Sequence, residues 1–118
     1  PFENEVVVVE LSGKQMKAMF QYLKNGTAHP ISGMEIQLSN DGEIKKALIQ
    51  GEEVADNNTY FIATNDYLMN GGDNMTFFEN PISVLRLDYK IRNVLIDYFK
   101  KYDTIAPVRD NRFTRDSK

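Results

Sequence analysis

The chain has 118 residues, of which 42% are hydrophobic and 26% are charged, with a formal net charge of -3. This length and apolar content suit one globular domain with one core, and they exclude a disordered or fibrous protein. There is no cysteine, which excludes disulfides and thiolate metal ligands. No apolar run approaches the roughly 20 residues that a membrane-spanning helix needs.

Basic residues are concentrated at the carboxyl end. Residues 107–118 contain four Lys or Arg, whereas residues 1–106 contain ten against fifteen Asp or Glu. This basic tail is short, and Asp110 and Asp116 interrupt it, so it is more typical of a solvated terminus than of a nucleic-acid interface. We therefore expect no nucleic-acid partner.

The first elements that the sequence predicts are a strand and a helix. Val6–Val9 form a continuous β-branched run, which is typical of a strand covered on both faces and central in its sheet. Ser12 and Gln15 have the spacing of a capping box, and apolar residues follow at intervals of three and four. The sequence therefore predicts a helix near residues 12–25.

The middle of the chain predicts three more strands and a loop. Residues 34–38 alternate in polarity, and an Asp-Gly turn separates them from the apolar stretch 44–49, so an antiparallel hairpin is expected. Residues 59–64 are aromatic and β-branched enough for another inner strand. The polar, glycine-bearing stretch 65–74 that follows is expected to be a loop at the end of a buried strand, where binding residues are often placed.

The last predicted elements are a helix and an edge strand. Apolar residues keep helical spacing from Arg86 to about residue 101, where two lysines suit the carboxyl end of the helix dipole. Residues 111–114 predict a short edge strand. Together these elements predict an α+β fold, with a mixed central sheet of five or six strands flanked by helices near residues 12–25 and 86–101.

The sequence offers little for catalysis. Hydrolysis at a two-metal centre needs several His and carboxylate ligands, but His29 is the only histidine and has no Asp-x-His or His-x-x-x-His partner. A packed or exposed loop role is therefore favoured for it. The Gly-Gly-Asp at 71–73 lacks the lysine of a P-loop, so taken alone it favours a tight turn over phosphate binding. We expect no catalytic residue, metal site or cofactor in this chain.

Two stretches carry a more specific pattern. Residues 59–78, TYFIATNDYLMNGGDNMTFF, combine an inner strand, a Thr-Asn-Asp-aromatic segment and an aromatic residue four positions before Gly-Gly-Asp. Residues 1–14, PFENEVVVVELSGK, place a Pro-Phe-x-Asn turn before a strand and a Leu-x-Gly helix start. Both stretches resemble the C-terminal, substrate-specificity domain of the 5'-nucleotidase and UDP-sugar hydrolase family. The resemblance covers nearly the whole chain, and since Pro1 is not a translational start, it implies that the domain's upstream part precedes it.

The resemblance also implies a set of substrate-binding residues. In that family two aromatic rings hold the nucleobase, and they correspond here to Phe2 and Tyr67, with Asn4 hydrogen-bonding the base and Asp73 accepting from the ribose hydroxyls. The implied set is Phe2, Asn4, Tyr67, Gly71, Gly72 and Asp73, in which the glycines shape the loop. Structural alternatives stay open: a core anchor for Phe2 and a packed loop aromatic for Tyr67.

For the chain as a whole the resemblance implies substrate recognition within a hydrolase that removes phosphate from nucleoside 5'-monophosphates or related esters. A separate metallophosphoesterase domain with two divalent metal ions, in the same or another chain, would perform the hydrolysis. The alternative is a stand-alone, non-catalytic nucleotide-binding or interaction module. We therefore expect residues 1–118 to form a single domain that binds a nucleoside or nucleotide without hydrolysing it. Family membership further implies a location outside the cytoplasm, in the periplasm or at the cell surface.

Overall fold

The structure is a computed structural model that describes residues 4–25, 29–101, 110 and 112–116. The chain folds into two compact units, each built on one sheet. Unit 1 comprises residues 1–11 and 59–108, and unit 2 comprises residues 12–58 and 109–118. The single domain expected from the chain length stays a prediction, because the structure defines each unit by itself.

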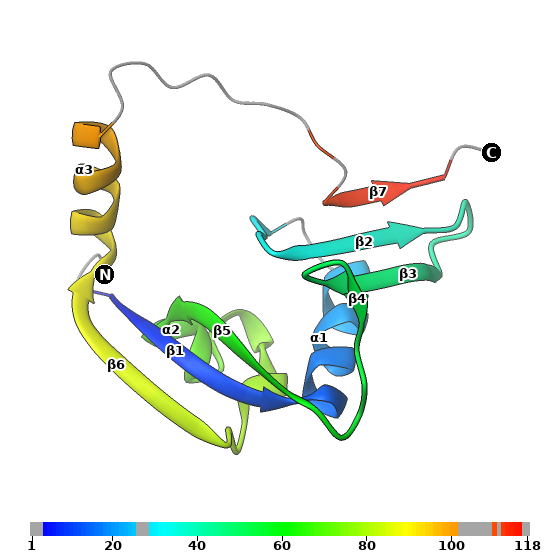
Figure 1. Cartoon of the computed structure of the whole chain (residues 1–118), viewed down its shortest axis with the longest axis horizontal. Coiled ribbons are helices and arrows are strands. Elements are labelled where there is room, and N and C mark those ends of the chain that lie inside the picture. The colour runs from blue at the N-terminus through cyan, green and yellow to red at the C-terminus, as the bar shows by residue number, and fades with distance from the viewer. Residues whose placement is uncertain (1–3, 26–28, 102–109, 111, 117–118) are drawn as a thin grey trace. The chain divides into compact units, whose positions relative to one another are not determined.

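Unit 1 is built on a three-stranded sheet in the order β5-β1-β6, in which β1 spans Glu5–Ser12, β5 spans Thr59–Asn65 and β6 spans Ser83–Lys90. Figure 1 shows β1 between the other two strands. It pairs antiparallel with β6, with Val8 opposite Leu85. The central place predicted for the β-branched run is confirmed.

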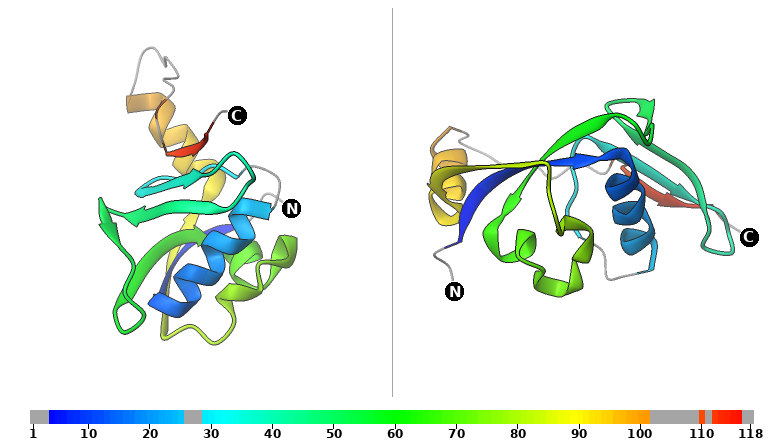
Figure 2. Two further views of the ribbon diagram at one scale, coloured as in Figure 1. Left: turned by 90° about the vertical axis from the view of Figure 1, so that its right-hand side faces the viewer. Right: turned by 90° about the horizontal axis from the view of Figure 1, so that it is seen from below.

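Short helices follow the strands of unit 1. They are α2 (Asp66–Met69), the 3-10 turns η1 (Gly72–Asn74) and η2 (Thr76–Phe78), and α3 (Ile91–Lys101). In the right-hand view of Figure 2, α2 and the two turns lie on one face of the sheet. The buried apolar side chains of the unit come from alternate positions of β1 and from the segment of these turns. They are Val7, Val9, Leu11, Met75, Phe77 and Phe78.

The opposite face of this sheet is apolar and exposed. Phe61 on β5 is 70% exposed, and Leu85 on β6 is 59% exposed. Side chains of directly paired residues share a face, so Leu85 lies beside Val8 of the central strand. Within the described part of unit 1, no element covers this face (Figure 2). Burial therefore stabilises unit 1 from one side of the sheet.

Unit 2 packs one helix against a four-stranded sheet in the order β4-β3-β2-β7. Its elements are α1 (Gly13–Asn25), β2 (Met34–Leu38), β3 (Ile44–Ile49), β4 (Glu52–Glu53) and β7 (Phe113–Arg115). The predicted capping box forms, since the Gln15 amide donates to Ser12 Oγ at 3.2 Å and the Ser12 amide donates to Gln15 Oε1 at 3.0 Å. Because β2 runs antiparallel to β3 but parallel to β7, the sheet is mixed.

The predicted α+β class is confirmed, but two of its details are corrected. The described strands form two sheets of three and four strands, not one sheet of five or six. The helix predicted from Arg86 begins only at Ile91, because residues 83–90 form β6. In that strand Leu85, Leu87 and Tyr89 alternate with polar residues, and β1 supplies backbone partners. The spacing of Leu87 and Ile91, four residues apart, also fits a helix, which explains the error.

Substitution of one phenylalanine on each face of the sheet of unit 1 should show which face contributes to stability. Phe78 is 3% exposed, so Phe78→Ala should lower the free energy of unfolding by about 3 to 5 kcal/mol. Phe61→Ala removes the same ring from a largely exposed position and should cost less than about 1 kcal/mol. Denaturant unfolding monitored by circular dichroism measures both. Equal losses of unfolding free energy in the two variants would contradict a sheet with one buried and one exposed face.

Candidate functional site

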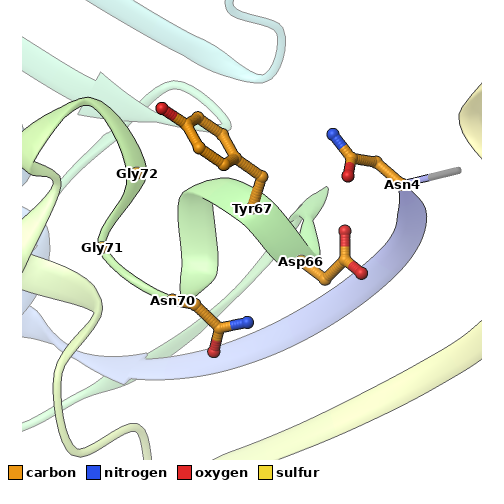
Figure 3. Close-up of a pocket in the computed structure, with 6 residues that line it drawn as sticks. All are labelled: Asn4, Asp66, Tyr67, Asn70, Gly71 and Gly72. Carbon is orange, nitrogen blue, oxygen red and sulfur yellow. The ribbon is translucent and has the colours of Figure 1, made fainter. Parts of the chain in front are cut away.

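The clearest candidate site is an open pocket of about 460 Å³ in unit 1. It forms where the residue preceding β1 meets the segment that follows β5. Figure 3 shows the residues that line it: Asn4, Asp66, Tyr67, Asn70, Gly71 and Gly72. Residues 4 and 66 are far apart in sequence, and they meet because β1 and β5 are neighbours in the sheet.

The segment after β5 is a short helix rather than the loop expected from its polarity. Asn65 caps it, since its side-chain oxygen accepts from the Leu68 amide at 2.9 Å. The Asn70 amide donates to the Asp66 carbonyl at 3.0 Å and closes the single turn. A capping asparagine is the usual start signal of a helix, so the Thr-Asn-Asp segment folds α2 locally. This turn carries Tyr67 outward, with 52% of the residue exposed.

Gly72 packs against the ring of Tyr67, and Gly71 shapes the turn that precedes Gly72. Gly71 has a φ of 97°, a left-handed conformation that glycine adopts without strain. A Cβ at Gly72 would lie 2.4 Å from Tyr67 Cε2, so this position packs against the ring edge and tolerates no side chain in its present conformation. The Tyr67 hydroxyl donates to Asp73 Oδ1 at 3.2 Å. The loop thus holds the ring at both its edge and its hydroxyl.

The predicted residues are therefore brought together in part. Asn4, Tyr67, Gly71 and Gly72 line one pocket, and Asp73 adjoins it through the tyrosine hydroxyl. Phe2 lies outside the described residues. Two lining residues, Asp66 and Asn70, were not among the predicted ones. Asp66 begins the short helix and Asn70 is its C-cap four residues later, so one helical turn brings both to the same side, and the asparagine cap that reveals this helix is visible in the sequence.

His29, the histidine for which a packed or exposed loop role was favoured, contacts Tyr22. Its ring lies against Tyr22, with ring centroids 5.8 Å apart, and Nε2 is 3.5 Å from the tyrosine hydroxyl. Within residues 4–25, 29–101, 110 and 112–116, no three His, Asp or Glu side chains are grouped so that they could hold a metal ion. In the same ranges no helix is long and apolar enough to cross a bilayer.

A second pocket, of about 320 Å³ in unit 2, is lined by three lysines but is a poor anion site. Each ammonium group is already paired with a carboxylate, at 2.7, 2.7 and 3.5 Å: Lys17 with Asp56, Lys45 with Asp116, and Lys46 with Glu35. The hydrogen bond from Lys17 lowers the pKa of Asp56 below its ordinary value. Because these charges are compensated, the pocket of unit 1 is the stronger candidate.

The family model described as 5'-nucleotidase, C-terminal domain matches residues 1–80, about two thirds of the chain. The chain belongs to this family. The matched range includes every residue that lines the pocket of unit 1, together with Phe2 and Asp73. The pocket of unit 1 therefore lies within the part of the chain that the family model matches.

Curated relatives and a solved structure agree with this assignment. The trifunctional nucleotide phosphoesterase protein YfkN of Bacillus subtilis (strain 168) is 32% identical over 95% of this chain and 9% of its own length. Protein UshA of Escherichia coli (strain K12) is 28% identical over 86% of this chain and 19% of its own. The crystal structure of the 5'-nucleotidase precursor from Thermus thermophilus superposes with a TM-score of 0.82 at 20% identity, over 98% of this chain and 26% of that one. The chain thus spans at most about a quarter of these proteins.

Alanine at the two glycines of the site should have different effects. Gly72→Ala should displace the Tyr67 ring, because the new methyl group would overlap its edge. Gly71→Ala meets no atom within 4 Å but requires a positive φ, so it should cost about 1 kcal/mol of stability and leave the ring in place. The tyrosine resonances in a nuclear magnetic resonance spectrum report the ring position. A ring shifted equally by both substitutions would contradict this account.

Proposed function

We propose that this chain holds the nucleoside part of the substrate of a 5'-nucleotidase-type phosphoric ester hydrolase. The observation that supports it most is the half-exposed ring of Tyr67 at a pocket lined by the side chains of Asn4, Asp66 and Asn70. A flat aromatic ring offers a stacking surface for a base, and amides and carboxylates match base edges and sugar hydroxyls. This combination suits a nucleoside better than it suits a purely apolar ligand.

The charge of the pocket favours the nucleoside over the phosphate. Asp66 lines it and Asp73 adjoins it, and none of the described residues that line it is cationic. A carboxylate accepts hydrogen bonds from hydroxyl and amino groups, but it repels a phosphate dianion. The ester phosphate is therefore proposed to point out of the pocket, toward the groups that would hydrolyse it.

Individual roles follow the family pattern. Tyr67 stacks on the base, and Phe2 supplies the second ring. Asn4 hydrogen-bonds the base edge. Asp73 accepts from the ribose hydroxyls, a role compatible with its contact to Tyr67, because a carboxylate has about four acceptor positions.

The chemistry is proposed to reside in a separate metallophosphoesterase domain with two divalent metal ions, in the same chain or another. Two observations support this: YfkN is named a nucleotide phosphoesterase, and this chain matches only a small share of its length. Metal ions polarise the phosphoryl group and activate water, whereas the aromatic pocket orients the leaving nucleoside. An extracytoplasmic location belongs to the same proposal.

Loss of the Tyr67 ring should weaken nucleoside binding. Tyr67→Ala should reduce the affinity for adenosine by about 1 to 3 kcal/mol, which is the usual contribution of one stacked base. Tyr67→Phe keeps the stacking surface and should have a much smaller effect. Isothermal titration calorimetry with the 118-residue chain measures both.

Phe61→Ala is the matched control, since it removes an exposed aromatic ring of the same unit outside the pocket. It should leave the affinity unchanged. Adenosine and AMP should bind with similar affinity, because the phosphate is proposed to lie outside the pocket. No binding of either ligand at millimolar concentration, or an unaffected Tyr67→Ala variant, would refute the proposed function.

Hydrolysis should need the additional domain. Residues 1–118 with added Mn²⁺, Mg²⁺ or Zn²⁺ should release no phosphate from AMP above the rate in buffer, as measured by a colorimetric phosphate assay. A positive result must be traced to this chain. Phosphate release that co-elutes with it through two chromatographic steps would contradict the proposal that hydrolysis resides in a separate domain.

A further inference from the structure

Asp66 lies at the junction of the two segments that form the pocket. It is the first residue of α2, directly before Tyr67, and its Oδ1 accepts a hydrogen bond from the backbone amide of Glu5 at 3.2 Å. Glu5 is the first residue of β1 and directly follows Asn4. Figure 3 shows the Asp66 side chain extending from α2 toward the start of β1. One carboxylate thus links the residue that follows Asn4 to the residue that precedes Tyr67.

The ladder between β1 and β6 is less regular at this end of β1 than farther along the strand. Glu5 pairs with Lys90 and Val7 pairs with Arg86, so the register between β1 and β6 shifts at this point. Asp88, inside the irregular segment, has a φ of 50°, which is typical of a bulge. From Val7 onward the ladder is regular as far as Glu10. Hydrogen bonds from outside the β1–β6 ladder therefore help to hold β1 at the end where the pocket lies.

Two such bonds flank Asn4. Its backbone carbonyl accepts from the Ile91 amide at 2.9 Å, and the next amide along the chain, that of Glu5, donates to Asp66. The first bond ties Asn4 to the start of α3, whereas the second ties it to α2 and hence to the loop that holds the Tyr67 ring. Removal of the Asp66 carboxylate would leave the first bond intact and would remove a side-chain link that joins the two sides of the pocket in addition to the pairing of β1 with β5.

We infer that Asp66 is a positioning residue that sets the distance between Asn4 and the Tyr67 ring, so that one ligand can contact both. This inference rests on the proposed function. Preorganisation raises affinity because the free protein need not be ordered when the ligand binds. A hydrogen-bond acceptor at Oδ1 is what the geometry requires, and the negative charge is not required. The role is therefore compatible with asparagine but not with alanine.

The link can be tested without any ligand. Asp66→Ala should increase the hydrogen exchange rate of the Glu5 amide by about tenfold or more, whereas Asp66→Asn should keep it protected. The Val9 amide, in the regular part of β1, serves as the internal reference and should not change. An unchanged Glu5 amide in Asp66→Ala would overturn the inference.

The consequence for binding is tested with adenosine by calorimetry. Asp66→Ala should weaken binding about tenfold, within the range found for coupled neighbouring residues, and Asp66→Asn, which keeps the acceptor for the Glu5 amide, should recover most of this loss. In a double-mutant cycle, Asn4→Ala should cost less in the Asp66→Ala background than in the parent, because the misplaced amide already contributes less. Asp56→Ala, an exposed aspartate of unit 2, is the control and should bind normally.

The possible results separate this inference from the function on which it rests. If Tyr67→Ala binds adenosine as the parent does, the proposed function fails. If Tyr67→Ala is weak but Asp66→Ala is normal, or if Asp66→Asn is as weak as Asp66→Ala, the positioning role alone fails. Should Asp66→Ala not fold, Asp66→Asn decides: it must fold and protect the Glu5 amide, and loss of either overturns the inference.

Discussion

The burial of β1 is the constraint on which the rest of unit 1 depends. Val7, Val9 and Leu11 are completely buried, and each contributes on the order of 1.5 to 3 kcal/mol by leaving water. Since side chains alternate along a strand, this burial fixes which face of β1 is turned inward. A shift of one residue would expose all three side chains. The positions of Asn4 before the strand and of β5 and β6 beside it follow from that register.

The geometry of the pocket depends on the position of β1. Because β5 hydrogen-bonds to β1, the end of β5 is held at a fixed distance from the start of β1, and a four-residue helix suffices to bring Tyr67 toward Asn4. The asparagine cap and the bond from Tyr67 to Asp73 then order a segment that is otherwise polar and glycine-rich. Placement on strand ends and capped turns explains how an open pocket can present a defined arrangement of groups.

Local signals in the sequence predicted much of the fold. The capping box of α1, the hairpin turn and the β-branched run of β1 each depend on residues a few positions apart, and all three are confirmed. The boundary between β6 and α3 depends on pairing with β1, some 80 residues away, so periodicity alone placed it wrongly. The same holds for the site. Tyr67 and the glycines belong to one continuous motif, whereas the partner of Asp66 is 61 residues distant and becomes visible only in the structure.

Exposure alone does not distinguish the pocket from the rest of the surface of unit 1. Phe61 is more exposed than Tyr67, yet it lies on an apolar sheet face, whereas Tyr67 is surrounded by an amide, a carboxylate and backbone groups of glycines. An apolar face attracts any apolar surface, because hydrophobic burial has no directional requirement. A ring surrounded by hydrogen-bonding groups discriminates between ligands. A ligand that stacks on the ring but leaves those groups unpaired removes them from water without giving them new partners, and this costs free energy. The polar groups around Tyr67, more than the ring itself, would thus make the pocket specific for a nucleoside.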